Sequence, residues 1–124
     1  MRILIFVKTF ANPTLTFIYN EILEMSKKHV VLVVTNERRN EALFPFQNVK
    51  EIPFSNENIF SKIKLKLQYN NIPLSFKNSN FKKSISEIVE NFKPDIIHTH
   101  FGFESWYFLY NFKNSLQIPI FISF

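Results

Sequence analysis

Two apolar runs with a helix-like stretch between them occupy the first 34 residues, and this order constrains the fold more than any other feature. Residues 2–8 and 30–34 read as strands buried on both faces, which is typical of a parallel sheet. From Thr14 onward the apolar residues fall at helical spacing: Leu15, Ile18, Ile22 and Met25. The pattern predicts a βαβ unit with parallel strands and a right-handed crossover.

The predicted first helix has polar residues at its start and along its outer face. Either Thr14 caps it, or Asn12 does so with Pro13 as the first helical residue. The side away from the sheet is expected to carry Asn20, Glu21 and Glu24.

The second half of the chain resumes the alternation of helix and strand. A helix is predicted by Ile85, Ile88, Val89 and Phe92, which follow the spacing i, i+3, i+4, i+7. Ser79 or Asn80 can cap this helix, and Pro94 stops it. We expect a strand over 95–100, a helix over 103–114 and a last strand over 118–124.

The middle of the chain is less regular. Residues 36–48 are predicted to form a polar loop, and 49–54 a short strand. Residues 60–69 alternate like a half-buried strand but also match a helix, which we favour because the flanking polar stretches are long. Residues 70–80 are expected to be a loop.

This alternation predicts the fold class: an α/β protein with an open, mostly parallel, Rossmann-like sheet and helices on both faces. A length of 124 residues suits one domain. Ligands of such sheets bind beyond the carboxyl ends of the strands, where residues 9–16 and 98–103 are expected.

Composition excludes several classes of site. The absence of Cys excludes disulfides and thiolate metal sites, and the single Gly excludes Gly-rich phosphate-binding loops. The net charge of +5 fits either an anionic partner or a Lys-rich solvated surface. No nucleic-acid-binding motif is recognisable, so we expect no nucleic-acid partner, and no cofactor is indicated.

The segment ending the strand at 95–100 carries the first candidate site. Alternation places His98 and His100 on one face, and Gly102 lets the chain turn into the next helix. Either an imidazole hydrogen-bonds a hydroxyl or phosphate, or His98 is a core residue and only His100 meets solvent. Two ligands are too few for a metal, and His29 is expected at the opposite end of the sheet, so no metal site is predicted.

The start of the first helix is the second candidate. Its free backbone N–H groups, with the hydroxyl groups of Thr14 and Thr16, can hold an anion or a sugar oxygen. The alternative interpretation is a helix cap with no ligand.

Three segments resemble family 4 glycosyltransferases, in the branch that makes bacterial exopolysaccharides of the colanic-acid type. These are residues 1–22, residues 93–102 (KPDIIHTHFG) and residues 118–124 (IPIFISF). The first departs from the family pattern at Ala11, Thr14 and Leu15, which stand for Pro, Ser and Glu. The second has Thr99 for Ala.

The resemblance implies a GT-B fold of two Rossmann-like domains, with the acceptor bound by the first and a nucleotide-sugar donor by the second. Residues 1–124 would be about the first two-thirds of the acceptor domain, without the donor domain. The intact protein would be a retaining hexosyltransferase acting on a glycan or lipid-linked acceptor for surface polysaccharide. The residues implied in substrate binding are Thr14, Thr16, His98, His100 and Gly102.

The resemblance also implies a cytoplasmic protein, and a lipid-linked acceptor would bring it to the inner face of the plasma membrane. A basic amphipathic helix over 60–69 would suit contact with anionic lipid; an ordinary surface element is the alternative. This chain alone is expected to be inactive. The rival hypothesis is a non-catalytic α/β binding module, or the remnant of a truncated gene.

Overall fold

The fold is an all-parallel sheet between helices, which confirms the predicted α/β class. The computed structural model describes residues 1–11, 16–52, 79–100, 105, 108–109, 112 and 117–123. Its elements are β1 (Arg2–Phe10), α1 (Thr16–Ser26), β2 (Val30–Arg38), β3 (Val49–Glu51), α4 (Ser79–Phe92), β4 (Ile96–His100) and β5 (Ile120–Ser123). The strands follow the order β3-β2-β1-β4-β5, and each neighbouring pair is parallel.

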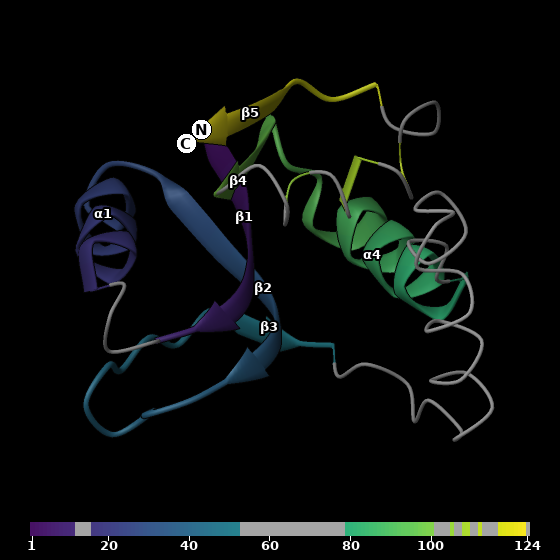
Figure 1. Ribbon diagram of the computed structural model, residues 1–124. Coiled ribbons are helices and arrows are strands. Elements are labelled where there is room, and N and C mark those ends of the chain that lie inside the picture. The colour runs from purple at the N-terminus through teal and green to yellow at the C-terminus, as the bar shows by residue number, and fades with distance from the viewer. Residues whose placement is uncertain are drawn as a thin grey trace, which may run out of the picture.

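The position of β1 determines where a ligand can bind. The sheet extends from β1 in two directions, with β2 and β3 on one side and β4 and β5 on the other (Figure 1). The direction of the strand order therefore reverses between β1 and β4. In open α/β sheets this reversal leaves a crevice beyond the carboxyl ends of the two strands, where ligands bind.

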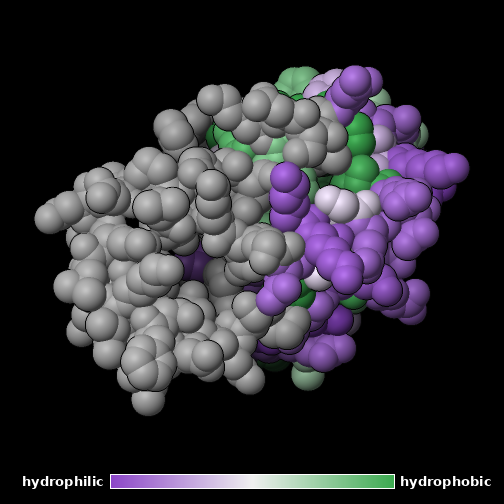
Figure 2. Space-filling view, turned by 90° about the vertical axis from the view of Figure 1, so that its right-hand side faces the viewer, coloured by the Kyte–Doolittle hydropathy of each residue, from purple (hydrophilic) through white to green (hydrophobic). Residues whose placement is uncertain are grey.

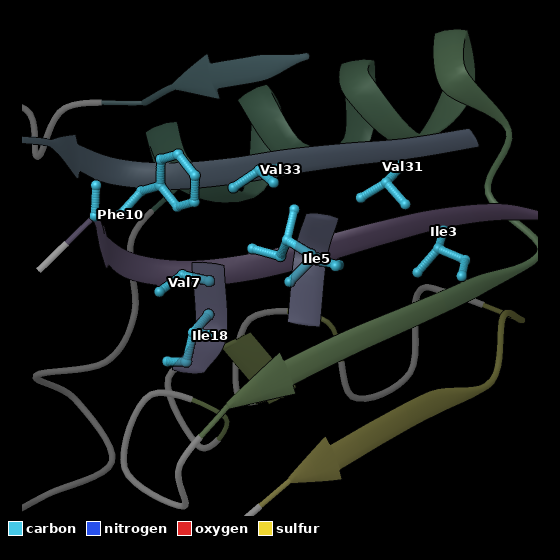
Figure 3. Close-up of a cluster of buried hydrophobic side chains, with 9 residues drawn as sticks. Ile3, Ile5, Val7, Phe10, Ile18, Val31 and Val33 are labelled. Carbon is cyan, nitrogen blue, oxygen red and sulfur yellow. The ribbon is translucent and has the colours of Figure 1, made fainter. Parts of the chain in front are cut away.

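Helix α1 covers one face of the sheet through the apolar stripe that the sequence indicates. Its buried residues Ile18 and Ile22 pack against alternate side chains of the two longest strands. The strand residues of this cluster are Ile3, Ile5, Val7, Phe10, Val31 and Val33 (Figure 3). Since both faces of β1 are covered, its residues from Ile3 to Val7 are all buried, as the continuous apolar run predicts.

The opposite face is covered by α4 and by aromatic residues from the following segment (Figure 1). Phe81 and Ile85 of α4 pack with Phe6 of β1, together with Phe108 and Phe112. The Phe6 ring lies 5.4 Å from the rings of both Phe81 and Phe108, measured between centroids. Figure 2 views the molecule from this side, where hydrophilic residues gather over the described surface.

Strand β2 is longer than predicted. The sequence favours a strand over 30–34 followed by a polar loop from residue 36, yet β2 continues to Arg38. Two buried polar side chains make this possible, because carbonyl groups of the strand itself and of its neighbours accept the hydrogen bonds that they donate. The Thr35 hydroxyl donates to the Lys8 or Glu37 carbonyl, at 3.1 and 2.9 Å, and the Asn36 amide donates to the Ile52 carbonyl at 3.1 Å.

Several other boundaries differ from the expected ones. Strand β1 runs to Phe10 rather than residue 8, β3 ends at Glu51, and β5 starts at Ile120 rather than residue 118. Asp95 precedes β4, and its carboxylate accepts a hydrogen bond of 2.7 Å from the Arg2 N–H. Helix α4 already includes residues 79–80, the end of the expected loop.

The predictions for residues 53–78, including the helix over 60–69, lie outside the described residues. Of the helix expected over 103–114, four residues are described, and all of them are helical: Ser105, Phe108, Leu109 and Phe112. Within the described ranges, neither α1 nor α4 combines the length and the apolar character that crossing a membrane requires.

Candidate functional site

The site lies where β4 ends beside β1, on the face that α1 covers. His98 is in register with Ile5 of β1, whose side chain belongs to the α1 cluster. His98 and His100 alternate with Thr99, so both imidazoles are on this face, as predicted. Their ring centroids are 4.5 Å apart. The Thr99 hydroxyl instead shares a hydrogen bond of 2.6 Å with the Ser105 hydroxyl.

Helix α1 contributes a third polar group, Glu21, although the helical pattern predicts this residue on the outer side of the helix. The Glu21 carboxylate lies 3.9 Å from His98 Nδ1 and 3.8 Å from His100 Nε2. Its side chain is 40% exposed, so it lies at the border between the packed stripe and solvent. Glu21 directly precedes Ile22 and lies beside the buried stripe of Ile18 and Ile22. Helical periodicity does not predict its contact with the histidines, which requires that β4 pairs with β1.

A hydrogen bond fixes the orientation of the His98 ring. Its Nε2 lies 2.6 Å from the Ser123 hydroxyl at the end of β5. The opposite ring nitrogen, Nδ1, therefore faces Glu21. One of the two interpretations of the sequence expects an imidazole at this edge to hydrogen-bond a hydroxyl group. In the structure that hydroxyl group belongs to Ser123 of the protein itself.

His100 is the more deeply buried of the two histidines, with 2% of its surface exposed. Burial lowers its pKa below the ordinary value, the charge of His98 lowers it further, and Glu21 opposes both effects. His100 is accordingly neutral at neutral pH. The alternative in which His98 is the core residue and His100 alone meets solvent is wrong, since the His98 side chain is 13% exposed and that of His100 only 3%.

The other predicted site residues are only partly described. Thr16 is the first residue of α1 and is exposed. Thr14 and Gly102 lie outside the described residues, so their predicted roles stay predictions. His29 directly precedes β2 and lies at the amino ends of the strands, as expected, away from the other two histidines.

Two imidazoles and one carboxylate give this edge of the sheet a defined chemistry. A neutral imidazole can accept or donate a proton, and a carboxylate accepts hydrogen bonds from hydroxyl groups. The same three groups are also ligands for a divalent cation, and one donor atom from each lies within 4.8 Å of the others. The site can thus bind a polyhydroxylated molecule, move a proton or hold a metal ion.

Comparison with solved structures supports the fold. The UDP-GlcNAc 2-epimerase of Neisseria meningitidis, solved bound to UDP-GlcNAc, matches 98% of this chain with a TM-score of 0.57 and 18% identity. The match covers 31% of that protein, so the chain spans about a third of its length. The C-terminal domain of a hydrogenase from Pyrococcus furiosus matches 99% of this chain and 90% of its own length, with a TM-score of 0.54 and 11% identity.

Comparisons of the sequence itself give no relative. No protein-family model matches the chain, and no curated protein matches it either. At 18% and 11% identity the two structural matches show a shared architecture alone. The chain therefore has a Rossmann-like α/β fold, with Glu21, His98 and His100 gathered at the carboxyl edge of its sheet.

Proposed function

We propose that the chain is the acceptor-binding part of a retaining, nucleotide-sugar-dependent glycosyltransferase with a GT-B fold. Three segments in the family's order support this, together with a fold shared with an epimerase that was solved with a nucleotide sugar bound. In this proposal residues 1–124 belong to the first of two Rossmann-like domains. The second domain binds the donor sugar nucleotide.

The observation that carries the proposal is the position of the polar triad. Glu21, His98 and His100 lie where β4 ends beside β1, at the edge where α/β sheets of this order bind ligands. Sugars are recognised through directional hydrogen bonds to their hydroxyl groups, and imidazole and carboxylate supply both donors and acceptors. Thr14, Thr16 and Gly102 complete the acceptor site in this proposal.

In this proposal transfer itself needs groups of the second domain. The leaving nucleoside diphosphate develops negative charge, which preorganised donors of the second domain would stabilise. The chain alone should therefore bind acceptor without transferring sugar. Such a protein would act in the cytoplasm, at the inner face of the plasma membrane where its acceptor is lipid-linked.

The first experiment measures ligand binding by the 124-residue chain. Saturation-transfer NMR should detect contact with oligosaccharide acceptors and none with UDP-GlcNAc. His98→Ala should weaken the acceptor signal, while His29→Ala at the other end of the strands should leave it unchanged. Turnover of any nucleotide sugar by the chain, or acceptor binding that survives His98→Ala, would contradict the proposal.

The second experiment concerns domain organisation. The DNA beyond the Phe124 codon should continue in frame into a His-Gly pair, which in the family follows this strand at the transfer cleft. A stop codon there would instead favour the rival hypothesis of a binding module or a gene remnant. Liposome co-sedimentation, with and without anionic lipid, tests the membrane contact expected of residues 60–69.

A further inference from the structure

We propose that Glu21, His98 and His100 form a binding site for a divalent transition-metal ion, with Zn²⁺ as the reference ion. One donor atom from each residue lies within 4.8 Å of the others. The expectation of no metal site depended on a count of two histidine ligands. Helix α1 supplies the third ligand, which comes from a segment far from His98 and His100 in the sequence.

The distances are close to those of a metal centre. Ligand atoms at about 2.0–2.1 Å from a tetrahedral Zn²⁺ are roughly 3.4 Å apart. The Glu21 carboxylate is 3.9 Å from His98 Nδ1 and 3.8 Å from His100 Nε2. These distances go to different carboxylate oxygens, Oε1 and Oε2, so metal binding requires the Glu21 side chain, which is 40% exposed, to rotate toward the two nitrogens.

The histidines are already oriented as ligands. His98 Nε2 is held by the Ser123 hydroxyl at 2.6 Å, so a proton on Nε2 leaves the Nδ1 lone pair directed toward Glu21. A hydrogen bond from the second ring nitrogen is the usual support of a metal-bound histidine. His100 is held by burial at the end of β4, and its Nε2 is on the Glu21 side.

The donor set selects the class of metal. Two imidazole nitrogens and one carboxylate suit Zn²⁺, Co²⁺ or Fe²⁺, whereas Mg²⁺ and Ca²⁺ prefer oxygen ligands throughout. Three protein ligands leave at least one coordination position for water or a substrate oxygen. This proposal rests on the geometry of the three side chains and not on the proposed transferase function.

The test is calorimetric titration of Zn²⁺ into the 124-residue chain, with the visible absorption of Co²⁺ reporting the ligand geometry. We expect one ion per chain. Glu21→Gln should remove the Co²⁺ absorption band and most of the affinity. Ser123→Ala, which removes only the support of His98, should weaken binding by about 10- to 100-fold.

Two matched controls locate the site. Glu24→Gln alters a neighbouring carboxylate of α1 that is exposed and paired with Lys27, and His29→Gln alters the third histidine of the chain. Both should bind Zn²⁺ like the unchanged protein. Circular dichroism verifies that each variant folds, and added Zn²⁺ should raise the Tm of the unchanged chain and both controls but not of Glu21→Gln.

Three results would overturn the proposal: no binding of Zn²⁺ or Co²⁺, binding that persists in Glu21→Gln, or binding that His29→Gln removes. Glu21→Gln is the decisive variant, because it should fold like the unchanged chain. The Glu21 side chain is 40% exposed, and glutamine has nearly the same shape as glutamate. The metal titration contains no sugar, and the acceptor-binding experiment contains no metal. A negative result for Zn²⁺ therefore does not contradict acceptor binding, and a negative result for the acceptor does not contradict the metal site.

Discussion

Replacing Thr35 with valine should destabilise the protein although the two side chains have nearly the same shape. Thr35 is fully buried near the carboxyl end of β2. Its hydroxyl oxygen accepts hydrogen bonds from the backbone N–H groups of Phe10, at 3.2 Å, and Glu37, at 3.3 Å. Through these bonds the side chain joins the ends of β1 and β2, where β1 leads toward α1.

The size of the effect follows from the groups left without a partner. A buried polar group that loses its hydrogen bond costs about 1–3 kcal/mol. The Phe10 N–H bond is buried, whereas that of Glu37 is partly buried and regains some hydration. The buried methyl group that replaces the hydroxyl stabilises the folded state by about 1 kcal/mol. The net loss in the free energy of unfolding for Thr35→Val should be about 2 kcal/mol.

Thr35→Ser is the matched variant, because it keeps the hydroxyl and removes one methyl group, at a cost of about 1 kcal/mol. Urea denaturation followed by circular dichroism gives both values. We expect Thr35→Val to unfold at a lower urea concentration than Thr35→Ser. If the valine variant is as stable as the serine variant, the hydroxyl does not hold the two strand ends together.

Three further substitutions test separate features. Lys93→Gly should raise the free energy of unfolding by about 1 kcal/mol in urea titrations, because Lys93 has a left-handed φ of 52° after α4; an equal or lower stability would contradict this. Ile85→Ala should lower it by about 2–5 kcal/mol, since Ile85 is fully buried between α4 and the sheet, whereas Glu87→Ala on the exposed side of the same helix should change it little. Because β5 ends the described sheet and Phe121 is 56% exposed, we expect the unchanged chain to self-associate in sedimentation velocity and Phe121→Lys to reduce this; a chain that stays monomeric would contradict the expectation.

The sequence predicts the helices and the buried strands because their apolar periodicity is local. Ile18 and Ile22 identify the packed stripe of α1, and the run from Ile3 to Val7 identifies a strand covered on both faces. The end of β2 escapes prediction because Thr35 and Asn36 are polar. Their burial depends on hydrogen bonds to Lys8 and Ile52, which a pattern within one segment does not reveal.

The candidate site likewise has one part that the sequence predicts and another that depends on the tertiary structure. Alternation along one strand is enough to place His98 and His100 on a common face. The part played by Glu21 depends on strand order, because β4 must pair with β1 before the helix after β1 can reach the histidines. Which histidine is deeper also depends on tertiary packing, and the sequence gives no local signal for it.

The pairing of β1 with both β2 and β4 has a consequence for the order in which the molecule forms. The segment from β1 through α1 to β2 closes over a short stretch of chain, whereas the bond between Arg2 and Asp95 joins residues 93 apart. Closing the longer loop costs more chain entropy, so β4 should join a β1–α1–β2 unit that has already formed. The polar triad is then assembled last, and opening of β4 and β5 alone would dismantle it while α1 remains packed. Hydrogen exchange should be faster in β4 than in the centre of β1.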